Sequence, residues 1–359
     1  MKNPLEAHPA WRQLVIVAGL LPVMIALAIL AFAWPAARIA PRELPLGIVG
    51  TPQASEQAVS GLSKVMPGGF ALHRYANEAS ARAAIDDRDV YGALMVTSTE
   101  ITVLEASAAS ATVAQLLTTV GEQLASEAPK HLVGRQPDAA PDVRIVDVVA
   151  SSAGDPRGLV LSSALLPLTI CSIIIASVIG LVIGFRPAWR QVVALVVVSG
   201  IAGLGAFLIA QSFLGALPGE HLATWAAVSL TLLAISSTAA GLIALIGLPG
   251  FALGAVLMVF VGNPFSGATS APQLLPAWVD HVGQWLPPGS GANLLRSTAY
   301  FDGNGAAGHL AVLVLWTIFG LSAVVVGHHT SPRFAAGQSR IAASRPPQPK
   351  VAELAFQDG

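Results

Sequence analysis

The chain has 359 residues, of which 54% are hydrophobic and 11% are charged, and its formal net charge is −1. A soluble globular domain carries about 25% charged residues, so this composition excludes an ordinary soluble protein and is typical of a membrane protein. The near-neutral charge gives no indication of a nucleic-acid partner, which would require a basic face.

Six apolar stretches predict six transmembrane helices, because a span needs about 20 predominantly apolar residues. They cover residues 14–37, 159–185, 192–214, 224–248, 250–262 and 309–327. The fifth is the shortest, and we expect Asn263-Pro264 to end it early. The first is either a cleaved signal peptide or a retained helix; its length favours retention.

The basic residues beside these stretches predict the orientation of the chain in the membrane. Six crossings place all of them on one side: Lys2, Arg12, Arg186, Arg190, Arg333, Arg340, Arg345 and Lys350. Since short cytoplasmic flanks are rich in Lys and Arg, we expect residues 1–13 and 328–359 to be cytoplasmic. The Pro-, Ser- and Ala-rich tail 328–359 is expected to be mostly disordered. Abundant Ala and the excess of Arg over Lys indicate a bacterial cell membrane.

Between the first two spans, residues 41–157 have the pattern of a small extracytoplasmic α/β domain, in which strands alternate with helices. Asn77 is a good N-cap for the second helix, and Ser98 and Thr99 form the turn of a hairpin. The expected strands are 44–49, 70–75, 91–97, 101–105 and 143–150, and the expected helices are 53–66, 78–86 and 108–127.

This domain shows no catalytic motif, so we expect the protein not to be an enzyme and to need no cofactor. The acidic cluster Asp86, Asp87 and Asp89 has the chemistry to bind a cation, but a solvated helix end is the favoured interpretation. His73 and His131 lack companions at metal-ligand spacing. We therefore predict no metal site.

The membrane half, residues 159–327, has almost no ionisable residues within its spans, which argues against a proton-coupled transporter. Its polar residues, such as Gln211 and Ser236-Ser237-Thr238, are better explained by helix packing. The sequence contains no phosphate-binding loop of the G-x-x-x-x-G-K-[ST] type. Any ATPase that powers transport must be a separate polypeptide.

Residues 262–303, GNPFSGATSAPQLLPAWVDHVGQWLPPGSGANLLRSTAYFDG, form the most distinctive stretch. From Leu274 an apolar stripe with Trp278 and Trp285 predicts a short amphipathic helix at the outer membrane interface. Pro287-Pro288 is expected to break it, and residues 291–300 to form a second helix. We interpret 263–303 as a segment that dips into the outer leaflet; an ordinary amphipathic loop is the alternative.

We expect the functional residues of the chain to lie in this segment, and Arg296→Ala and Trp285→Ala to impair function without preventing membrane insertion. For Arg296, pairing with a lipid phosphate or snorkelling is an equally good interpretation. The candidate residues are Trp278, Trp285, Pro287, Pro288, Arg296 and Tyr300.

Three motifs carry a resemblance to a known family. They are PLGIVGTPQ after the first span, RYANEASARAAIDDRDVYGALMV in the domain, and the segment from GNPFSG to AYFDG before the last span. With the six-span layout, they resemble the ABC-2 type permease superfamily, within it the YhgE/Pip-like (phage infection protein-like) group. The loop 184–190 departs from the family, which places there a longer segment that contacts the ATPase.

The resemblance implies a permease-like subunit that works as a homodimer or heterodimer with a separate ATP-binding subunit. Its substrate would be hydrophobic or amphipathic and would be exported from the lipid bilayer. The alternative function is a non-transporting receptor or scaffold that acts through the α/β domain.

Overall fold

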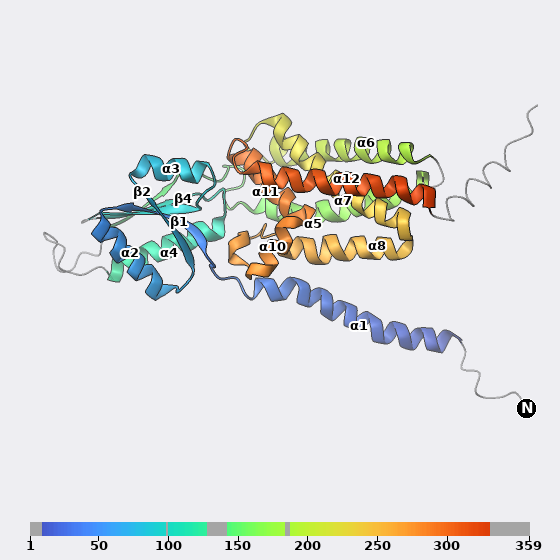
Figure 1. Cartoon of the computed structure of the whole chain (residues 1–359), viewed down its shortest axis with the longest axis horizontal. Coiled ribbons are helices and arrows are strands. Elements are labelled where there is room, and N and C mark those ends of the chain that lie inside the picture. Colours follow the sequence, from blue (N-terminus) through green and yellow to red (C-terminus); the bar gives the residue numbers. More distant parts are fainter. Residues whose placement is uncertain (1–8, 98–99, 128–141, 184–186, 331–359) are drawn as a thin grey trace, which may run out of the picture.

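The computed structural model describes residues 9–97, 100–127, 142–183 and 187–330. Within them, six helices are long and apolar enough to cross a membrane, as predicted, and a small sheet lies in the chain between the first and the second. Figure 1 shows the sheet at one end of the molecule, with the apolar helices extending away from it. The predicted turn at Ser98 and Thr99 and the tail beyond Thr330 lie outside the described residues.

The five predicted strands form a single mixed sheet in the order β2-β1-β3-β4-β5. β1 pairs in parallel with both β2 and β3, and β4 pairs in parallel with β5. In each of these pairs at least one helix lies between the two strands in the chain, as a parallel connection requires. β3 and β4 pair antiparallel, which confirms the predicted hairpin. The strands are β1 (Leu44–Gly50), β2 (Phe70–Tyr75), β3 (Gly92–Val96), β4 (Glu100–Glu105) and β5 (Asp142–Asp147).

Helices cover both faces of the sheet, α3 on one and α2 with α4 on the other (Figure 1). The Asn77 side chain accepts from the Ser80 backbone N–H at 2.9 Å, so the predicted cap of α3 is confirmed. The third helix was predicted to begin at residue 108 and begins at Ala111, because the Ser110 Oγ caps it by accepting from Val113 N. The helices are α2 (Pro52–Val65), α3 (Glu78–Asp86) and α4 (Ala111–Glu127).

Residues from the membrane half complete the hydrophobic core of the α/β unit. Ala271 and Leu274 pack in the cluster formed by β1 and α4, and both are buried. Phe301 packs in the cluster on the α3 face of the sheet, and only 4% of its surface is exposed. The α/β unit is therefore joined to the rest of the molecule by shared core packing as well as by the chain.

Five of the apolar helices form a bundle in which α7 is central. α7 packs against the other four, α5, α6, α8 and α12, and against α11. Small side chains allow these close approaches; a Cβ added at Gly241 would lie 2.7 Å from the Gly320 carbonyl oxygen. Ser199 and Ser236 hydrogen-bond between α6 and α7, as expected for packing polar residues. The bundle consists of α5 (Leu159–Ile183), α6 (Ala188–Phe207) with π-helix η1 (Leu208–Phe213), α7 (His221–Ile246), α8 (Leu248–Ala255) with η2 (Val256–Gly262) and α9 (Asn263–Phe265), and α12 (Ala306–Thr330).

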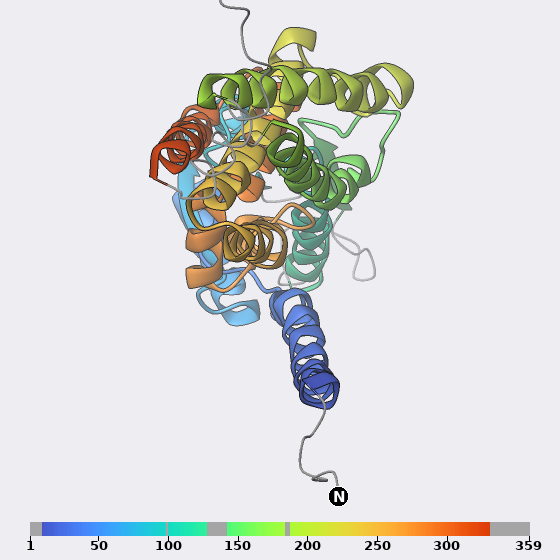
Figure 2. The same cartoon turned by 90° about the vertical axis from the view of Figure 1, so that its right-hand side faces the viewer.

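The first apolar helix, α1 (Pro9–Ala36), diverges from this bundle in both views (Figures 1 and 2). It contacts the bundle near its end, where Phe32 lies edge-on to Phe260 with ring centroids 6.4 Å apart. Most of its other described apolar side chains are exposed. Such a surface is compatible with lipid and not with water.

The fifth span ends close to the predicted stop at Asn263-Pro264, one residue beyond the proline. The apolar helix runs from Leu248 to Phe265, 18 residues, which is close to the minimum for crossing a bilayer. Its last turns are π-helical, and the Asn263 Nδ2 donates to the Met258 carbonyl oxygen at 3.0 Å. A side-chain donor thus satisfies a carbonyl near the proline, which has no N–H of its own.

The segment that follows contains η3 (Pro272–Leu274), α10 (Ala277–Trp285) and α11 (Pro287–Tyr300). Pro287 and Pro288 start α11 rather than merely ending α10, because proline fits the first turn of a helix. In α10 the buried positions are Val279 and Gly283, while the tryptophans of the predicted apolar stripe face outward. Nearly all of α11 is buried.

Candidate functional site

The two candidate tryptophans lie on the outer surface of α10. Trp278 is 57% exposed and contacts the rings of Trp34 and Phe265, with centroids 5.6 and 5.4 Å away. Trp285 is 65% exposed, and its carbonyl oxygen accepts from Trp316 Nε1 of α12 at 2.7 Å. These contacts join α10 to α1 and α12 and leave both indoles facing outward.

The other four candidate residues belong to the buried helix α11. Pro287 and Pro288 form its first turn, and Tyr300 at its end donates to the Ala216 carbonyl oxygen at 2.5 Å. Arg296 is only 6% exposed. The structure therefore does not bring the six candidates together: the tryptophans point outward and the residues of α11 point into the protein.

Arg88, which the sequence analysis did not select, reaches from the α/β unit into α11. It follows α3 and adopts φ 64°, a backbone conformation that favours glycine. Its guanidinium donates to the Asn293 carbonyl oxygen at 3.1 Å, to Asn293 Oδ1 at 3.1 Å and to Ser297 Oγ. Its Cζ also lies 5.3 Å from the centre of the Phe301 ring.

Asn293 connects this arginine to the candidate Arg296. Its Oδ1 accepts from Arg88 at 3.1 Å and from Arg296 at 3.4 Å, so one amide oxygen serves two guanidiniums. Arg296 also donates to the Ala268 carbonyl oxygen at 3.2 Å. The Asn293 Nδ2 in turn donates to Gln284 Oε1 of α10 at 2.7 Å.

Neither guanidinium is neutralised by a carboxylate. Among the described residues, the ion pair within 4 Å joins Arg82 and Glu78, on the outer surface of α3. Burial lowers the pKa of both arginines, that of Arg88 to about 10, and repulsion from Arg296 adds to the shift at Arg88. Both remain cationic at neutral pH, so the cluster holds two positive charges and neutral acceptors.

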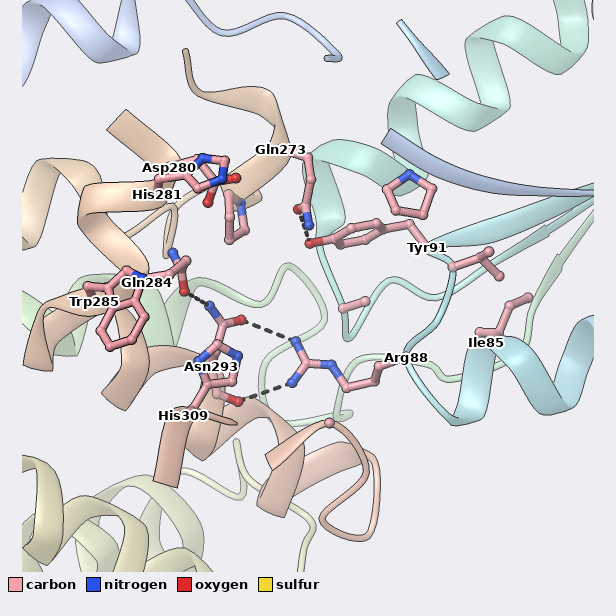
Figure 3. Close-up of a pocket in the computed structure, with 15 residues that line it drawn as sticks. Ile85, Arg88, Tyr91, Gln273, Asp280, His281, Gln284, Trp285, Asn293 and His309 are labelled. Atoms are coloured by element: carbon pink, nitrogen blue, oxygen red, sulfur yellow. Dashed lines mark hydrogen bonds between the residues drawn. The ribbon is translucent and has the colours of Figure 1, made fainter. Parts of the chain in front are cut away.

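A cavity of about 360 Å³ lies beside this cluster, between the α/β unit and α10, α11 and α12 (Figure 3). Arg88 and Asn293 face it from one side, and Gln284 and Trp285 from another. Tyr91 and Gln273 also line the cavity, and the Tyr91 hydroxyl donates to Gln273 Oε1 at 2.7 Å. The lining also includes Ile85, Asp280, His281 and His309.

Asp280 is the one carboxylate among the residues that line this cavity. Burial raises its pKa, and the neighbouring His281 opposes the shift only in part. His281 itself is held by a hydrogen-bonding contact of 2.7 Å between Nδ1 and the Ala277 carbonyl oxygen. Asp280 therefore takes up a proton more readily than an exposed aspartate does.

A second cavity, of about 370 Å³, lies between α1, α5 and the turn after α9. It is lined mainly by apolar side chains, including Phe32, Leu165 and Leu166. Ala268 belongs to this lining, and its carbonyl oxygen holds Arg296. The arginine cluster thus lies between a cavity lined by both polar and apolar groups and a mainly apolar one.

The aspartates that flank Arg88 agree with the favoured interpretation of a solvated helix end. Asp86, Asp87 and Asp89 are exposed, and Asp87 Oδ1 accepts from Asn304 Nδ2 at 3.2 Å. In the part of the chain that the structure describes, no group of three or more His, Cys, Asp or Glu side chains has the geometry to hold a metal. Two features of the sequence could have indicated the cluster of Arg88, Asn293 and Arg296. Arg88 lies between a predicted helix and a predicted strand, and Asn293 lies three residues before Arg296.

The chain matches no protein-family model, no curated protein sequence and no solved structure. The resemblance to ABC-2 type permeases therefore stays a prediction that depends on the quoted motifs and the six-span layout.

Proposed function

We propose that this protein is a permease-like membrane subunit that exports a hydrophobic or amphipathic substrate from a bacterial cell membrane. The observation that carries the proposal is the cavity beside Arg88. Its lining combines polar and apolar groups in similar amounts, and it includes Trp285, whose indole is mostly exposed on the apolar side of α10. Such a site, open to an apolar surface, suits a molecule with one polar and one apolar part.

The proposed orientation places the α/β unit and this cavity outside the cytoplasm, with both termini inside. Basic flanks support it: α6, whose first turn contains Arg190, begins at the end of the bundle far from the α/β unit (Figure 1), and the connection before α7 carries no Lys or Arg. Substrate leaving the outer leaflet would then meet the α10–α11 segment first.

The energy for export is proposed to come from a separate ATP-binding subunit. In the described parts of the six apolar helices, ionisable side chains such as Arg190, His221 and His328 lie near the ends. No buried relay of such groups crosses the described bundle, which argues against coupling to protons. We include a homodimer or heterodimer in the proposal on the family resemblance alone.

The competing function is a receptor or scaffold that acts through the α/β unit. The core packing of Leu274 and Phe301 in that unit favours a joint action of the two halves over an independent ligand-binding domain. Deleting residues 44–150, which would remove this unit, would also expose those side chains. That deletion is therefore a poor test, and point substitutions are needed.

The test is purification of the tagged protein from its native membranes in a mild non-ionic detergent, after cross-linking. We expect an ATP-binding subunit to copurify, and the reconstituted complex to move a fluorescent phosphatidylglycerol between leaflets when ATP is added. Vesicles with the protein alone, and with a non-hydrolysable nucleotide, are the controls. Repeated absence of an ATP-binding partner would refute ATP coupling, and an ATP-hydrolysing complex that moves no lipid would refute the substrate class.

A further inference from the structure

Two guanidiniums, that of Arg296 buried and that of Arg88 partly buried, share one amide oxygen, and neither forms an ion pair within 4 Å among the described residues. Arg88 and Arg296 both donate to Asn293 Oδ1, and their other described acceptors are carbonyl or hydroxyl oxygens. Burying like charges together costs free energy, and neutral acceptors recover only part of it. The arrangement is electrostatically incomplete unless a negative charge binds next to it.

Arg88 retains the capacity to bind such a charge. A guanidinium has five N–H donors, and the three hydrogen bonds described for Arg88 occupy two of its nitrogens, Nη1 and Nη2. The side chain lines the cavity, and Figure 3 shows its guanidinium between Asn293 and the open space toward Tyr91. Phe301 and the Asn293–Ser297 contacts hold it in place, so little side-chain entropy remains to be lost on binding.

The position of Arg88 in the backbone argues that its side chain is specifically needed there. It lies directly after the C-cap of α3 with φ 64°, where glycine is the favoured residue. An arginine in this conformation is strained relative to glycine. Nonglycine residues with such backbone strain cluster at functional sites.

We propose that the cavity beside Arg88 binds an anionic group, a phosphate or a carboxylate, with Arg88 as its direct ligand and Arg296 as a second positive charge behind Asn293. The volume of about 360 Å³ suits such a group with a small polar attachment. The exposed face of Trp285 at the cavity leaves room for an apolar chain. The site deepens the proposed export function, since it names the substrate as an anionic amphiphile.

Asp280 lies across the cavity from Arg88 in Figure 3 and is the feature that opposes this inference. It forms no described ion pair with either arginine, and its pKa is raised by burial, so its negative charge is the easier one to lose. The two arginines carry two positive charges, and Asp280 is the one negatively charged side chain of the cavity lining, since histidines such as His281 and His309 carry no negative charge. The balance favours an anion over a cation as the ligand.

The test measures binding to the purified full-length protein in a non-ionic detergent, at constant ionic strength, by calorimetry. The probes are dihexanoyl phosphatidylglycerol, the uncharged dihexanoylglycerol, and sodium phosphate. We expect binding of an anionic probe and none of dihexanoylglycerol. Phosphatidylglycerol binding more tightly than phosphate would identify a lipid headgroup as the ligand, and equal binding would identify a free anion; either result supports the proposal.

The variants separate Arg88 from the charge of the protein as a whole. Arg88→Gln should weaken binding at least about tenfold, as expected for losing a charged hydrogen bond, and Arg88→Lys should bind with intermediate affinity. Arg82→Gln is the matched control, because Arg82 lies on α3, the helix that Arg88 follows, and pairs with Glu78 on the surface. Asp280→Asn should bind the anion as tightly as the wild type or more tightly.

Binding of the uncharged lipid with equal affinity, absence of binding by both anions, or wild-type affinity of Arg88→Gln would overturn the proposal. If Arg88→Gln does not fold, His309→Trp, which fills the cavity and keeps the Arg88 hydrogen bonds, must abolish binding. Because this experiment measures binding and not transport, a failure of the anion-binding inference can be distinguished from a failure of the proposed export function.

Discussion

At the residue scale, Arg88 and Arg296 show what a sequence reveals of a buried charge. The sequence analysis selected Arg296 from its place in the segment 263–303 and considered lipid-phosphate pairing or snorkelling for it. The structure instead buries it against Asn293 and Ala268. Arg88 is 208 residues away in the sequence, and the two meet because the Arg88 side chain, just after α3, reaches Asn293 of α11, a contact that no local pattern predicts.

Arg296→Ala and Trp285→Ala are expected to have different effects on stability, although the sequence analysis grouped them. Removing the buried Arg296 leaves an empty volume and an unpaired Ala268 carbonyl, and we expect a loss of about 2–4 kcal/mol. Removing the exposed Trp285 indole should cost under about 1 kcal/mol. Thermal unfolding in detergent checks this, and equal melting temperatures for the two variants would contradict the burial of Arg296.

At the element scale, helices and strands could be predicted from the sequence where one physical rule determines them. Apolar length predicted the six long helices, and alternation with turn residues predicted all five strands of the sheet. Helix boundaries were less accurate, because a single local cap moves them: Ser110 caps α4, which begins three residues later than predicted. The strand order was not predicted, because local patterns do not specify which strands become neighbours.

The contact of α7 with α12 depends on glycine. A Cβ at Gly320 would collide with the backbone of Ser237 and Thr238, so the two helices touch there through their main chains. We expect Gly320→Ala to lower stability by about 2 kcal/mol, since the helices must separate. Gly308→Ala in the same helix is the matched control, because a Cβ there meets nothing within 4 Å.

Thermal unfolding and size-exclusion profiles in detergent measure this difference. Gly308→Ala should be neutral or slightly stabilising, as alanine is the better helix former. Equal, neutral or stabilising effects of the two substitutions would show that helix propensity, and not packing between α7 and α12, controls the result.

At the scale of the whole molecule, the α/β unit and the membrane half form one structure. Leu274 and Phe301 from the membrane half complete the two cores that flank the sheet, and Arg88 and Ser110 reach back to hold residues of that half. The composition of residues 41–157 suggested a separate domain, because the side chains that close its core lie more than 100 residues later. Any movement of α10 and α11 would therefore be transmitted to the sheet.

The central claim of this account is that the α/β unit and its cavity lie outside the cytoplasm of a protein with six spans. Cysteine labelling in intact cells tests it most directly, after Cys171→Ser removes the native thiol. Ser63→Cys, exposed on α2, should react with a membrane-impermeant maleimide, and Thr330→Cys, at the far end of α12, should react only after permeabilisation. The reverse pattern, or labelling of both positions in intact cells, would contradict the claim.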